Sequence, residues 1–285
     1  MHKERHLSIE EFKQVHPWPD QSEVSALFRF MPICSENTEF LEHLFIENKL
    51  YHSLTSGFND PFEGKPHFTM DNSKNNARAI REHLKKVARN NGMSRKNAET
   101  LISNSMKDPN FIPTSIASAT AKIFNELRIC SFTTNKKNLL FWSHYANSHK
   151  GICVEFDATI MPIAFAYKVE YSNDYPQITF PLPPDERAFK PVLVKAKAWE
   201  YEDEYRTMFV PSAMRLPNDG ESLLLHSSTI TDVYLGSEIS NIDKQAVLEI
   251  ILKSNFNPRI WQANLSSNSF DLEFIQLKKR PLSNL

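Results

Sequence analysis

The chain has 285 residues, with 33 Lys and Arg against 34 Asp and Glu, so its formal charge is −1 and no overall positive field would recruit nucleic acid or an anionic membrane. The chain has only six glycines, at positions 57, 64, 92, 151, 220 and 236. Their spacing fits neither the G-x-G-x-x-G motif nor a Walker loop, which excludes Rossmann dehydrogenases, P-loop NTPases and protein kinases. No apolar stretch approaches the roughly 20 residues of a membrane helix, and the polar start is unlike a signal peptide. The three cysteines form no CxxC pair, which suits a reducing compartment. We therefore expect a cytoplasmic protein without membrane contact.

The first part of the chain alternates short helices and strands. A capping box, Ser8-x-x-Glu11, predicts a short helix that stops before the prolines at 17 and 19. A strand at 27–30, a helix from about 36 to 48 and a strand at 49–53 follow from the hydrophobic spacing. The next segment, 56–63, contains Asp60-Pro61 and is predicted to be a loop.

Residues 71–128 change character. Three apolar stripes at helical spacing predict helices that continue to residue 127. Residues 71–108 contain nine Lys and Arg and four Asp and Glu, an excess of five positive charges. We interpret 71–128 as a basic helical insert or cap within a single α+β domain that spans 1–285. The basic face of 71–108 either contacts the phosphates of a nucleic acid or is an ordinary solvated helix face.

The rest of the chain is rich in predicted strands. They lie at 128–132, 152–156, 165–171, 191–199, 204–210, 232–235, 260–265 and 270–277. Helices are expected at 139–148, closed by Gly151 just past the helix end, and at 243–253. The proline-rich segment 175–185 is predicted to be a loop. This order of elements favours an α+β fold with a mixed, mostly antiparallel sheet.

The strongest local pattern is Trp199-Glu200-Tyr201-Glu202-Asp203-Glu204-Tyr205-Arg206. Read as a strand, it puts Glu202, Glu204 and Arg206 on one face, where the two carboxylates raise each other's pKa and the guanidinium lowers both. This group suits an acid–base or cation-binding site, and the alternative is an exposed strand with a cross-strand ion pair. The flanking aromatic rings can add a stacking surface only if the strand starts or bulges here.

Other candidate motifs carry weaker signals. The loop 58–63 either is turn architecture or lines a site, and Asp60 and Glu63 lack a His or third acid at metal-ligand spacing. His144 and His149, five residues apart, do not share a helix face as a metal pair would, and His144 is interpreted as a core histidine. Ser131 has no G-x-S-x-G elbow around it, which gives a hydrolase nucleophile little support.

Several strings occur in a fixed order along the chain: Phe58-Asn59-Asp60-Pro61-Phe62-Glu63, Cys130-Ser131-Phe132, Phe141-Trp142-Ser143-His144-Tyr145-Ala146, His149-Lys150-Gly151-Ile152-Cys153-Val154-Glu155-Phe156, the Trp199–Arg206 string and Val233-Tyr234-Leu235-Gly236. In this order the chain resembles a widespread bacterial domain family of unknown function, from about 27 to 277. The N-terminal helix and the basic insert depart from that family's pattern. This resemblance implies no particular activity.

A second resemblance concerns mechanism. Arg29 in Leu-Phe-Arg-Phe, then Ser131-Phe132-Thr133-Thr134, then Glu202-Asp203-Glu204 follow the order seen in ADP-ribosyltransferases of the Arg–Ser–Glu type. The resemblance implies an α+β split sheet that binds NAD, as substrate, without a Rossmann motif and without a metal ion.

This second resemblance also implies roles for individual residues. Arg29 would hold the pyrophosphate, and Glu204 would bind the nicotinamide ribose and stabilise its oxocarbenium-like charge. Glu202 would orient or deprotonate the acceptor. The implied catalytic residues are therefore Glu204, Glu202 and Arg29, and the implied NAD contacts are Arg29, Ser131, Tyr145, Tyr201 and Asn59.

Three functions stay open at this point. The first is an NAD-consuming ADP-ribosyltransferase-like enzyme or NAD glycohydrolase, a toxin or anti-phage effector that acts on an unidentified protein or nucleic-acid acceptor. The second is a metal-dependent nuclease or phosphodiesterase with Asp60, Glu63, Glu155 and Asp157 as ligands. The third is a non-enzymatic binding module.

The first function makes two structural predictions. Arg29 and Glu204 should project into one groove, with Tyr145 or Tyr201 on its wall. The substitution Glu204→Gln should abolish activity at little cost in stability, because a carboxylate beside another carboxylate is strained.

Overall fold

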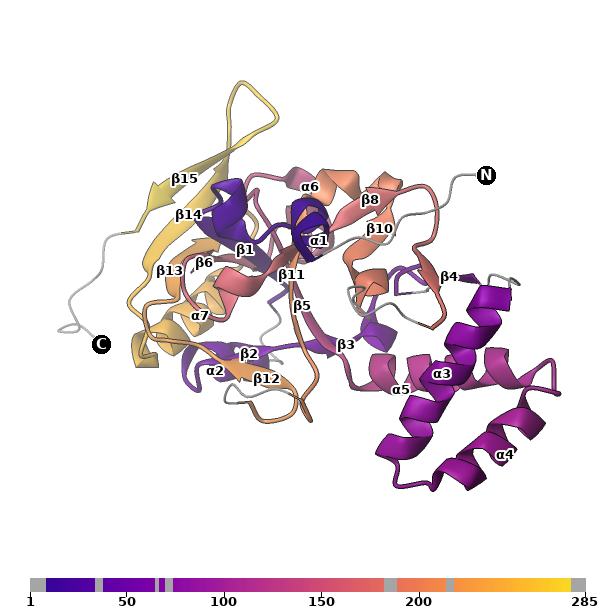
Figure 1. Cartoon of the computed structure of the whole chain (residues 1–285). Helices are drawn as coiled ribbons and strands as arrows, with labels where there is room; N and C mark the ends of the chain where they lie inside the picture. Colours follow the sequence, from indigo (N-terminus) through magenta and orange to yellow (C-terminus); the bar gives the residue numbers. More distant parts are fainter. Residues whose placement is uncertain are drawn as a thin grey trace.

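A computed structural model describes residues 9–33, 38–64, 67–69, 74–181, 189–213 and 218–277. Its centre is a nine-stranded sheet in the order β15-β14-β13-β6-β1-β5-β11-β7, with β3 also paired to β5 (Figure 1). Within this described sheet only β13 and β14 run parallel, which confirms the predicted α+β fold with a mostly antiparallel sheet. The strands are β1 (Ala26–Met31), β3 (Ser53–Leu54), β5 (Arg128–Thr133), β6 (Ile152–Asp157), β7 (Tyr167–Lys168), β11 (Glu204–Phe209), β13 (Ile230–Leu235), β14 (Arg259–Leu265) and β15 (Leu272–Gln276).

Three short strand pairs lie outside the main sheet. They are β2 (Lys49–Tyr51) with β12 (Ser222–Leu224), β8 (Glu170–Ser172) with β10 (Val194–Ala196), and β4 (His67–Thr69) with β9 (Gln177–Thr179). The β9 strand falls in the segment 175–185 that was predicted to be a loop, so that prediction is wrong at 177–179, and residues 182–185 lie outside the described residues. Its partner β4 is more than 100 residues away in the chain, and such a partner leaves no local signal.

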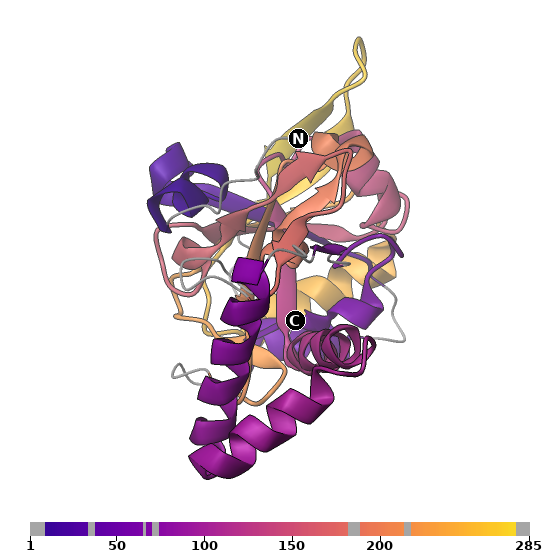
Figure 2. The same ribbon diagram turned by 45° about the vertical axis from the view of Figure 1, so that its right-hand side comes forward.

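Seven α-helices occur in the described ranges: α1 (Ile9–Val15), α2 (Glu39–Phe45), α3 (Lys74–Asn90), α4 (Arg95–Ser105), α5 (Phe111–Glu126), α6 (Leu139–His144) and α7 (Asn241–Lys253). Helices α3, α4 and α5 occupy the predicted insert and project from one side of the body (Figures 1 and 2). Residues 71–73, Ser8, Cys34 and positions 36–37 of the predicted second helix lie outside the described residues. None of the described helices combines the length and apolar character needed to cross a membrane.

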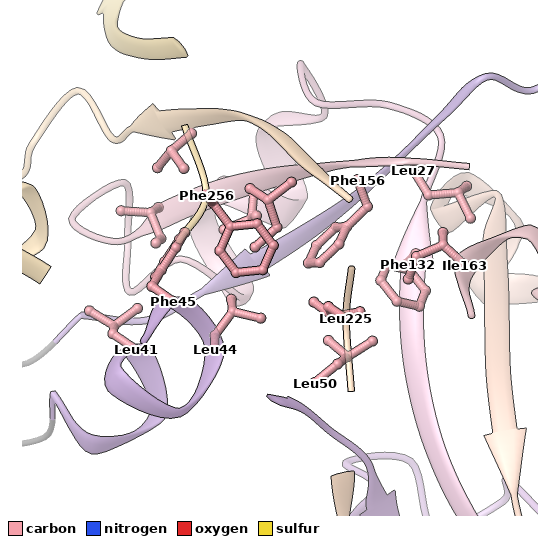
Figure 3. Close-up of a cluster of buried hydrophobic side chains, with 14 of the residues drawn as sticks. Leu27, Leu41, Leu44, Phe45, Leu50, Phe132, Phe156, Ile163, Leu225 and Phe256 are labelled. Carbon is pink, nitrogen blue, oxygen red and sulfur yellow. The ribbon is translucent and has the colours of Figure 1, made fainter. Parts of the chain in front are cut away.

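The main core lies between one face of the sheet and helices α2 and α7. Leu44 and Phe45 of α2, Leu27 of β1, Phe156 of β6 and Phe256 all belong to this buried cluster, with Phe45 edge-on to Phe256 (Figure 3). Burial of this many large apolar side chains is the main stabilising contribution to the fold.

The opposite face of the sheet carries a second apolar cluster. Phe28 and Phe30 of β1 pack there against Phe141 and Trp142 of α6, with Phe30 edge-on to Trp142 at 5.1 Å between ring centroids. Strand β1 therefore alternates between two buried layers, which fixes the face toward which each of its side chains points.

The helix predicted at 139–148 is shorter than expected, because α6 ends at His144. The chain then turns through Asn147, Ser148 and His149, which all have positive φ angles. Gly151 is not the residue that ends this helix. A Cβ at Gly151 would lie 2.2 Å from the carbonyl oxygen of Met31, so this glycine is needed for close approach to β1.

Three predicted strands are interrupted. The segment 191–199 is mostly 3₁₀ helix, with η4 (Lys190–Leu193) and η5 (Lys197–Glu202) on either side of β10. The segment 165–171 begins in η3 (Ile163–Phe165) and divides into β7 and β8, and 49–53 breaks at His52 into β2 and β3. Two further 3₁₀ turns are η1 (Pro19–Ser22) and η2 (Thr55–Gly57). Apolar runs of this length cannot by themselves distinguish a strand from a buried turn.

Candidate active site

The Glu-Asp-Glu motif forms a corner instead of a straight strand. Glu202 is the last residue of η5, Asp203 has a left-handed φ of 42°, and Glu204 is the first residue of β11. Asp tolerates this conformation better than most residues, and the Thr134 hydroxyl donates a hydrogen bond to its carboxylate. The prediction that Glu202 and Glu204 alternate along one strand face is therefore wrong. The corner nevertheless brings both carboxylates to the same cation.

That cation is Lys195 of β10. Its Nζ lies 2.5 Å from Glu202 Oε2, 3.1 Å from Glu204 Oε2 and 2.8 Å from Glu63 Oε1. Arg206, two residues after Glu204 on β11, donates from Nε and Nη2 to the two oxygens of Glu204 at 2.7 and 2.8 Å, and from Nη2 to Glu63 at 3.0 Å. All five side chains are at most 5% exposed. We call Glu63, Lys195, Glu202, Glu204 and Arg206 the ionic cluster.

The ionic cluster has a net negative charge. Three carboxylates and two cations leave one negative charge in excess when all five groups are ionised. Burial would raise the pKa of Glu204, but Arg206 and Lys195 outweigh it and lower that pKa to about 2. The pKa of Glu202 is raised instead, because burial outweighs the attraction of Lys195. Glu202 thus exchanges a proton more readily than Glu204.

A cavity of about 270 Å³ opens onto the ionic cluster. All five members of the cluster line it. Its apolar walls come from four different parts of the chain, with the lining rings Phe28, Phe30, Phe58, Phe132 and Phe141. The Tyr145 hydroxyl, also in the lining, donates to Glu202 Oε1 at 2.8 Å. A buried polar floor under aromatic walls is the usual composition of a small-molecule site.

Arg29 lines the same cavity, but it reaches it by an unexpected route. The paired residues Phe28, Thr133 and Glu204 share one face of the sheet, so alternation points Arg29 toward the opposite face. The expectation that alternation aims Arg29 and Glu204 into one groove is therefore wrong. Strands β1 and β5 pair only at Phe28 and Thr133 and then separate.

The guanidinium of Arg29 enters the gap between these strands. It donates from Nη1 to the Cys130 Sγ at 2.7 Å and to the carbonyl of Ser131 at 3.2 Å. Burial raises the pKa of the Cys130 thiol to about 11, so this sulfur is protonated and Arg29 keeps its full positive charge. Among the described residues, no carboxylate lies within ion-pair distance of Arg29. The cavity therefore has a negative floor and a positive group at the strand gap.

The other predicted contact residues divide between the cavity and the surface. Ser131 lines the cavity, and its hydroxyl hydrogen-bonds Glu204. Asn59 lines it as well, and its Nδ2 donates to the Tyr145 hydroxyl at 3.4 Å. Tyr201 is outside the lining, 39% exposed, with its carbonyl accepting a hydrogen bond from Asn138. The structure thus brings Arg29, Ser131, Asn59, Tyr145, Glu202 and Glu204 together and leaves Tyr201 out.

The four acids considered as metal ligands do not converge. Asp60 accepts from the Trp199 indole at 2.8 Å, and Glu63 belongs to the ionic cluster. On β6, Glu155 accepts from the Tyr234 hydroxyl at 2.6 Å, while Asp157 binds Thr159. Within the described ranges, no three His, Cys, Asp or Glu side chains form a metal-binding group. The proposed ligand set for a nuclease or phosphodiesterase is therefore wrong.

Lys195 is the site residue that the sequence analysis missed. It stands alone in the apolar run Pro191-Val192-Leu193-Val194-Lys195-Ala196. A lysine in such a run is rarely buried unless it is paired, so this position could have been identified as a buried cation in need of carboxylates. Its ammonium pKa is raised, because the three glutamates outweigh the effect of burial.

The physical reason for the expected tolerance of Glu204 to substitution is wrong. Glu204 is not strained by its neighbouring carboxylate, because two cations hold it and lower its pKa to about 2. Replacing it with Gln would leave Arg206, which is 1% exposed, without its bidentate partner. Glu63 would then be its remaining carboxylate partner, and removal of one member of a buried ion pair is strongly destabilising.

Comparisons with protein-family models, with curated proteins and with solved structures found no match to this chain.

Proposed function

We propose that the protein is an NAD-consuming enzyme of the ADP-ribosyltransferase type, which breaks the bond between nicotinamide and ribose inside the cavity. The observation that carries the proposal is that the negatively charged ionic cluster lines one aromatic cavity together with Arg29, which has no carboxylate partner among the described residues. NAD has the complementary pattern, because its nicotinamide riboside is cationic and its pyrophosphate is anionic.

The proposed reaction assigns a task to each end of the cavity. The C1′–N bond breaks with its electron pair leaving on nicotinamide, and positive charge develops on the ribose beside the ionic cluster. Fixed negative charge in a buried site stabilises such a transition state strongly. Arg29 binds the pyrophosphate through its remaining donors, and the phenylalanine walls contact the nicotinamide ring.

Glu202 is the proton acceptor in this proposal. The nucleophilic acceptor forms a bond to C1′ and loses its proton to Glu202, whose raised pKa suits that transfer. The Tyr145 hydroxyl holds Glu202 in place. Glu204 stays ionised and keeps Lys195 and Arg206 in position, and through its ribose-facing charge it contributes to the stabilisation of the transition state.

The test is incubation of the protein with NAD, with release of nicotinamide measured by chromatography. We expect Glu202→Gln to lower the rate of release by about 10²- to 10³-fold. Glu200→Gln is the matched control, because Glu200 lies on the same turn, is exposed and does not line the cavity. Absence of nicotinamide release in the presence of protein, DNA and RNA acceptors would overturn the proposal.

The resemblance to a bacterial family of unknown function, and an origin as a toxin or anti-phage effector, remain proposals of the same kind. An enzyme that depletes NAD would arrest the growth of the cell that makes it. Expression of the intact chain should therefore slow growth and lower cellular NAD, and the Glu202→Gln variant should do neither.

A further inference from the structure

The insert α3–α5 separates charge along the chain. Residues 71–108 carry a formal charge of +5, and since the whole chain carries −1, the remaining residues carry −6. The insert projects away from the acidic remainder in both views (Figures 1 and 2). A local positive field of this kind attracts polyanions even when the protein as a whole is nearly neutral.

The positive charge is ordered on α3. Arg78, Arg81, Lys85 and Arg89 follow one another at spacings of three, four and four residues, which places them on one side of the helix. Arg78, Arg81 and Arg89 are exposed, and Lys85 is half-buried beside Glu82. At 1.5 Å rise per residue the row extends over roughly 16 Å. We call these four residues the basic row.

The opposite side of α3 packs against α5 through Ile80 and Leu84. Ile80 is buried against Ile112 and Ile116 of α5, and Leu84 packs against the same small core. A membrane-surface helix must keep its apolar side free for lipid, whereas Ile80 and Leu84 of α3 are engaged by α5 and leave only Val87 as an exposed large apolar side chain among the described residues of this helix. The basic row is the side of α3 that remains for a partner.

We propose that the basic row binds the phosphodiester backbone of a nucleic acid. Duplex DNA presents one negative charge per about 1.7 Å of axis, so a row of about 16 Å meets phosphates along its whole length. Arginine, which makes three of the four contacts, is suited to phosphate because its planar donors bind two oxygens at once. The contact is to the backbone and carries no sequence preference.

The insert also lies next to the cavity. Helix α5 contacts β3 and η2, whose residues Ser53 and Gly57 line the cavity, and α5 leads directly into β5 with Ser131. The α5 part of the insert therefore adjoins the wall of the cavity. That a nucleic acid bound to the insert is the acceptor of ADP-ribose rests on the proposed function, whereas the binding itself does not.

The experiment measures binding of the intact protein to fluorescently labelled duplex DNA, single-stranded DNA and RNA, without NAD, over a series of salt concentrations. For four phosphate contacts on duplex DNA, log K against log[salt] should have a slope of about −3.6. The double variant Arg78→Gln/Arg81→Gln should reduce the steepness of that slope by about 2 and weaken binding at least tenfold.

The matched control is Lys150→Gln/Lys253→Gln, which removes the same charge from exposed positions outside the insert and should leave binding unchanged. Circular dichroism checks that α3 stays folded, as expected because Gln is a good helix former. Three results would overturn the proposal: no binding at low salt, an equal loss in the control variant, or binding to anionic phosphatidylserine vesicles and not to nucleic acid. If the protein releases no nicotinamide from NAD but its nucleic-acid binding still has the expected dependence on salt, only the proposed function is overturned.

Discussion

At the scale of single residues, Glu202 and Glu204 show how two carboxylates of one motif acquire different properties. Glu204 has a bidentate partner in Arg206 and is held ionised. Glu202 has Lys195 and the neutral Tyr145 hydroxyl, and its pKa is raised. The number of cationic partners, which depends on the corner at Asp203, decides which carboxylate is structural and which one can exchange a proton.

The two glutamates should therefore differ in their contribution to stability. Glu204→Gln should lower the free energy of unfolding by about 3–5 kcal/mol, because it removes the bidentate carboxylate of a buried guanidinium and leaves Arg206 with Glu63 alone. Glu202→Gln should cost about 1–2 kcal/mol, since Lys195 keeps two other carboxylates. Urea unfolding of both variants measures the difference. Equal midpoints for the two variants would contradict this assignment.

His52 should make stability depend on pH. It is fully buried, and its Nδ1–H donates to the Leu50 carbonyl, which leaves Nε2 to accept the Thr207 hydroxyl. Burial lowers its folded pKa from 6.5 to about 3. Below pH 6.5 the unfolded chain binds a proton that the folded chain does not, so stability is present above pH 6.5 and falls as the pH decreases toward 3.

The loss should approach about 1.4 kcal/mol per pH unit at 25 °C for this one group. His52→Gln should flatten the pH dependence of unfolding between pH 6 and pH 4 by that amount, measured by urea titration at each pH. His144 is exposed, so its interpretation as a core histidine is wrong, and His144→Gln serves as the control that should leave the slope unchanged. An unchanged slope in His52→Gln would contradict the prediction.

At the scale of elements, close backbone approach joins β13 to the turn that follows α6. The Gly236 N–H donates to the Gly151 carbonyl at 2.9 Å, and a Cβ at Gly236 would lie 2.0 Å from the His149 carbonyl oxygen. The His149 carbonyl oxygen is a backbone atom and cannot rotate away as a side chain would. One of the two backbone segments must therefore move to admit a methyl group at Gly236.

Gly236→Ala should accordingly lower the free energy of unfolding by about 1–3 kcal/mol. Gly57→Ala is the control, because its Cβ would have ordinary contact distance, 3.9 Å, to the nearest atom. Thermal unfolding of both variants tests this. A Gly236→Ala protein as stable as Gly57→Ala would mean that the two segments can separate without cost.

Elements with strong periodicity were predictable from the sequence, and those set by distant partners were not. Strands β1, β5, β6 and β11 and helix α7 lie within a few residues of their predicted ranges, because their alternation or helical spacing is uninterrupted. The gap between β1 and β5, which admits Arg29, depends on β3 pairing with the rest of β5. No local pattern contains that information.

The candidate site was predictable in its residues but not in its arrangement. Glu202, Glu204 and Arg206 form a recognisable motif, yet the predicted strand geometry is wrong, because a single left-handed residue at Asp203 turns the chain and leaves no periodic signal. Lys195, 7 and 9 residues before the two glutamates, carries a signal only when burial of its segment is assumed.

At the scale of the whole molecule, the protein has cores of unequal size. The sheet, α2 and α7 share a large buried cluster, while the insert relies on a small one around Ile80, Ile112 and Ile116. Regions with few buried apolar contacts open more readily than the rest of a fold. The insert should therefore open locally while the sheet remains closed.

Hydrogen exchange should show this difference directly. Amides of α3 and α4 should exchange with an opening free energy at least ~2 kcal/mol below that of β6 and β13, which lie inside the sheet. Addition of duplex DNA should raise the protection of α3 and leave β13 unchanged if the basic row binds it. Uniform protection across both regions would indicate one cooperative unit instead.

The scattered origin of the cavity also bears on how the cell makes this protein. Its lining extends along the chain from Phe28 on β1 to Arg206 on β11, and Arg29 and Glu204 are 175 positions apart (204 − 29). A chain still emerging from the ribosome lacks the ionic cluster until β11 has been synthesised and paired. The proposed consumption of NAD would thus be absent during most of the chain's synthesis and would begin only with completion of the fold.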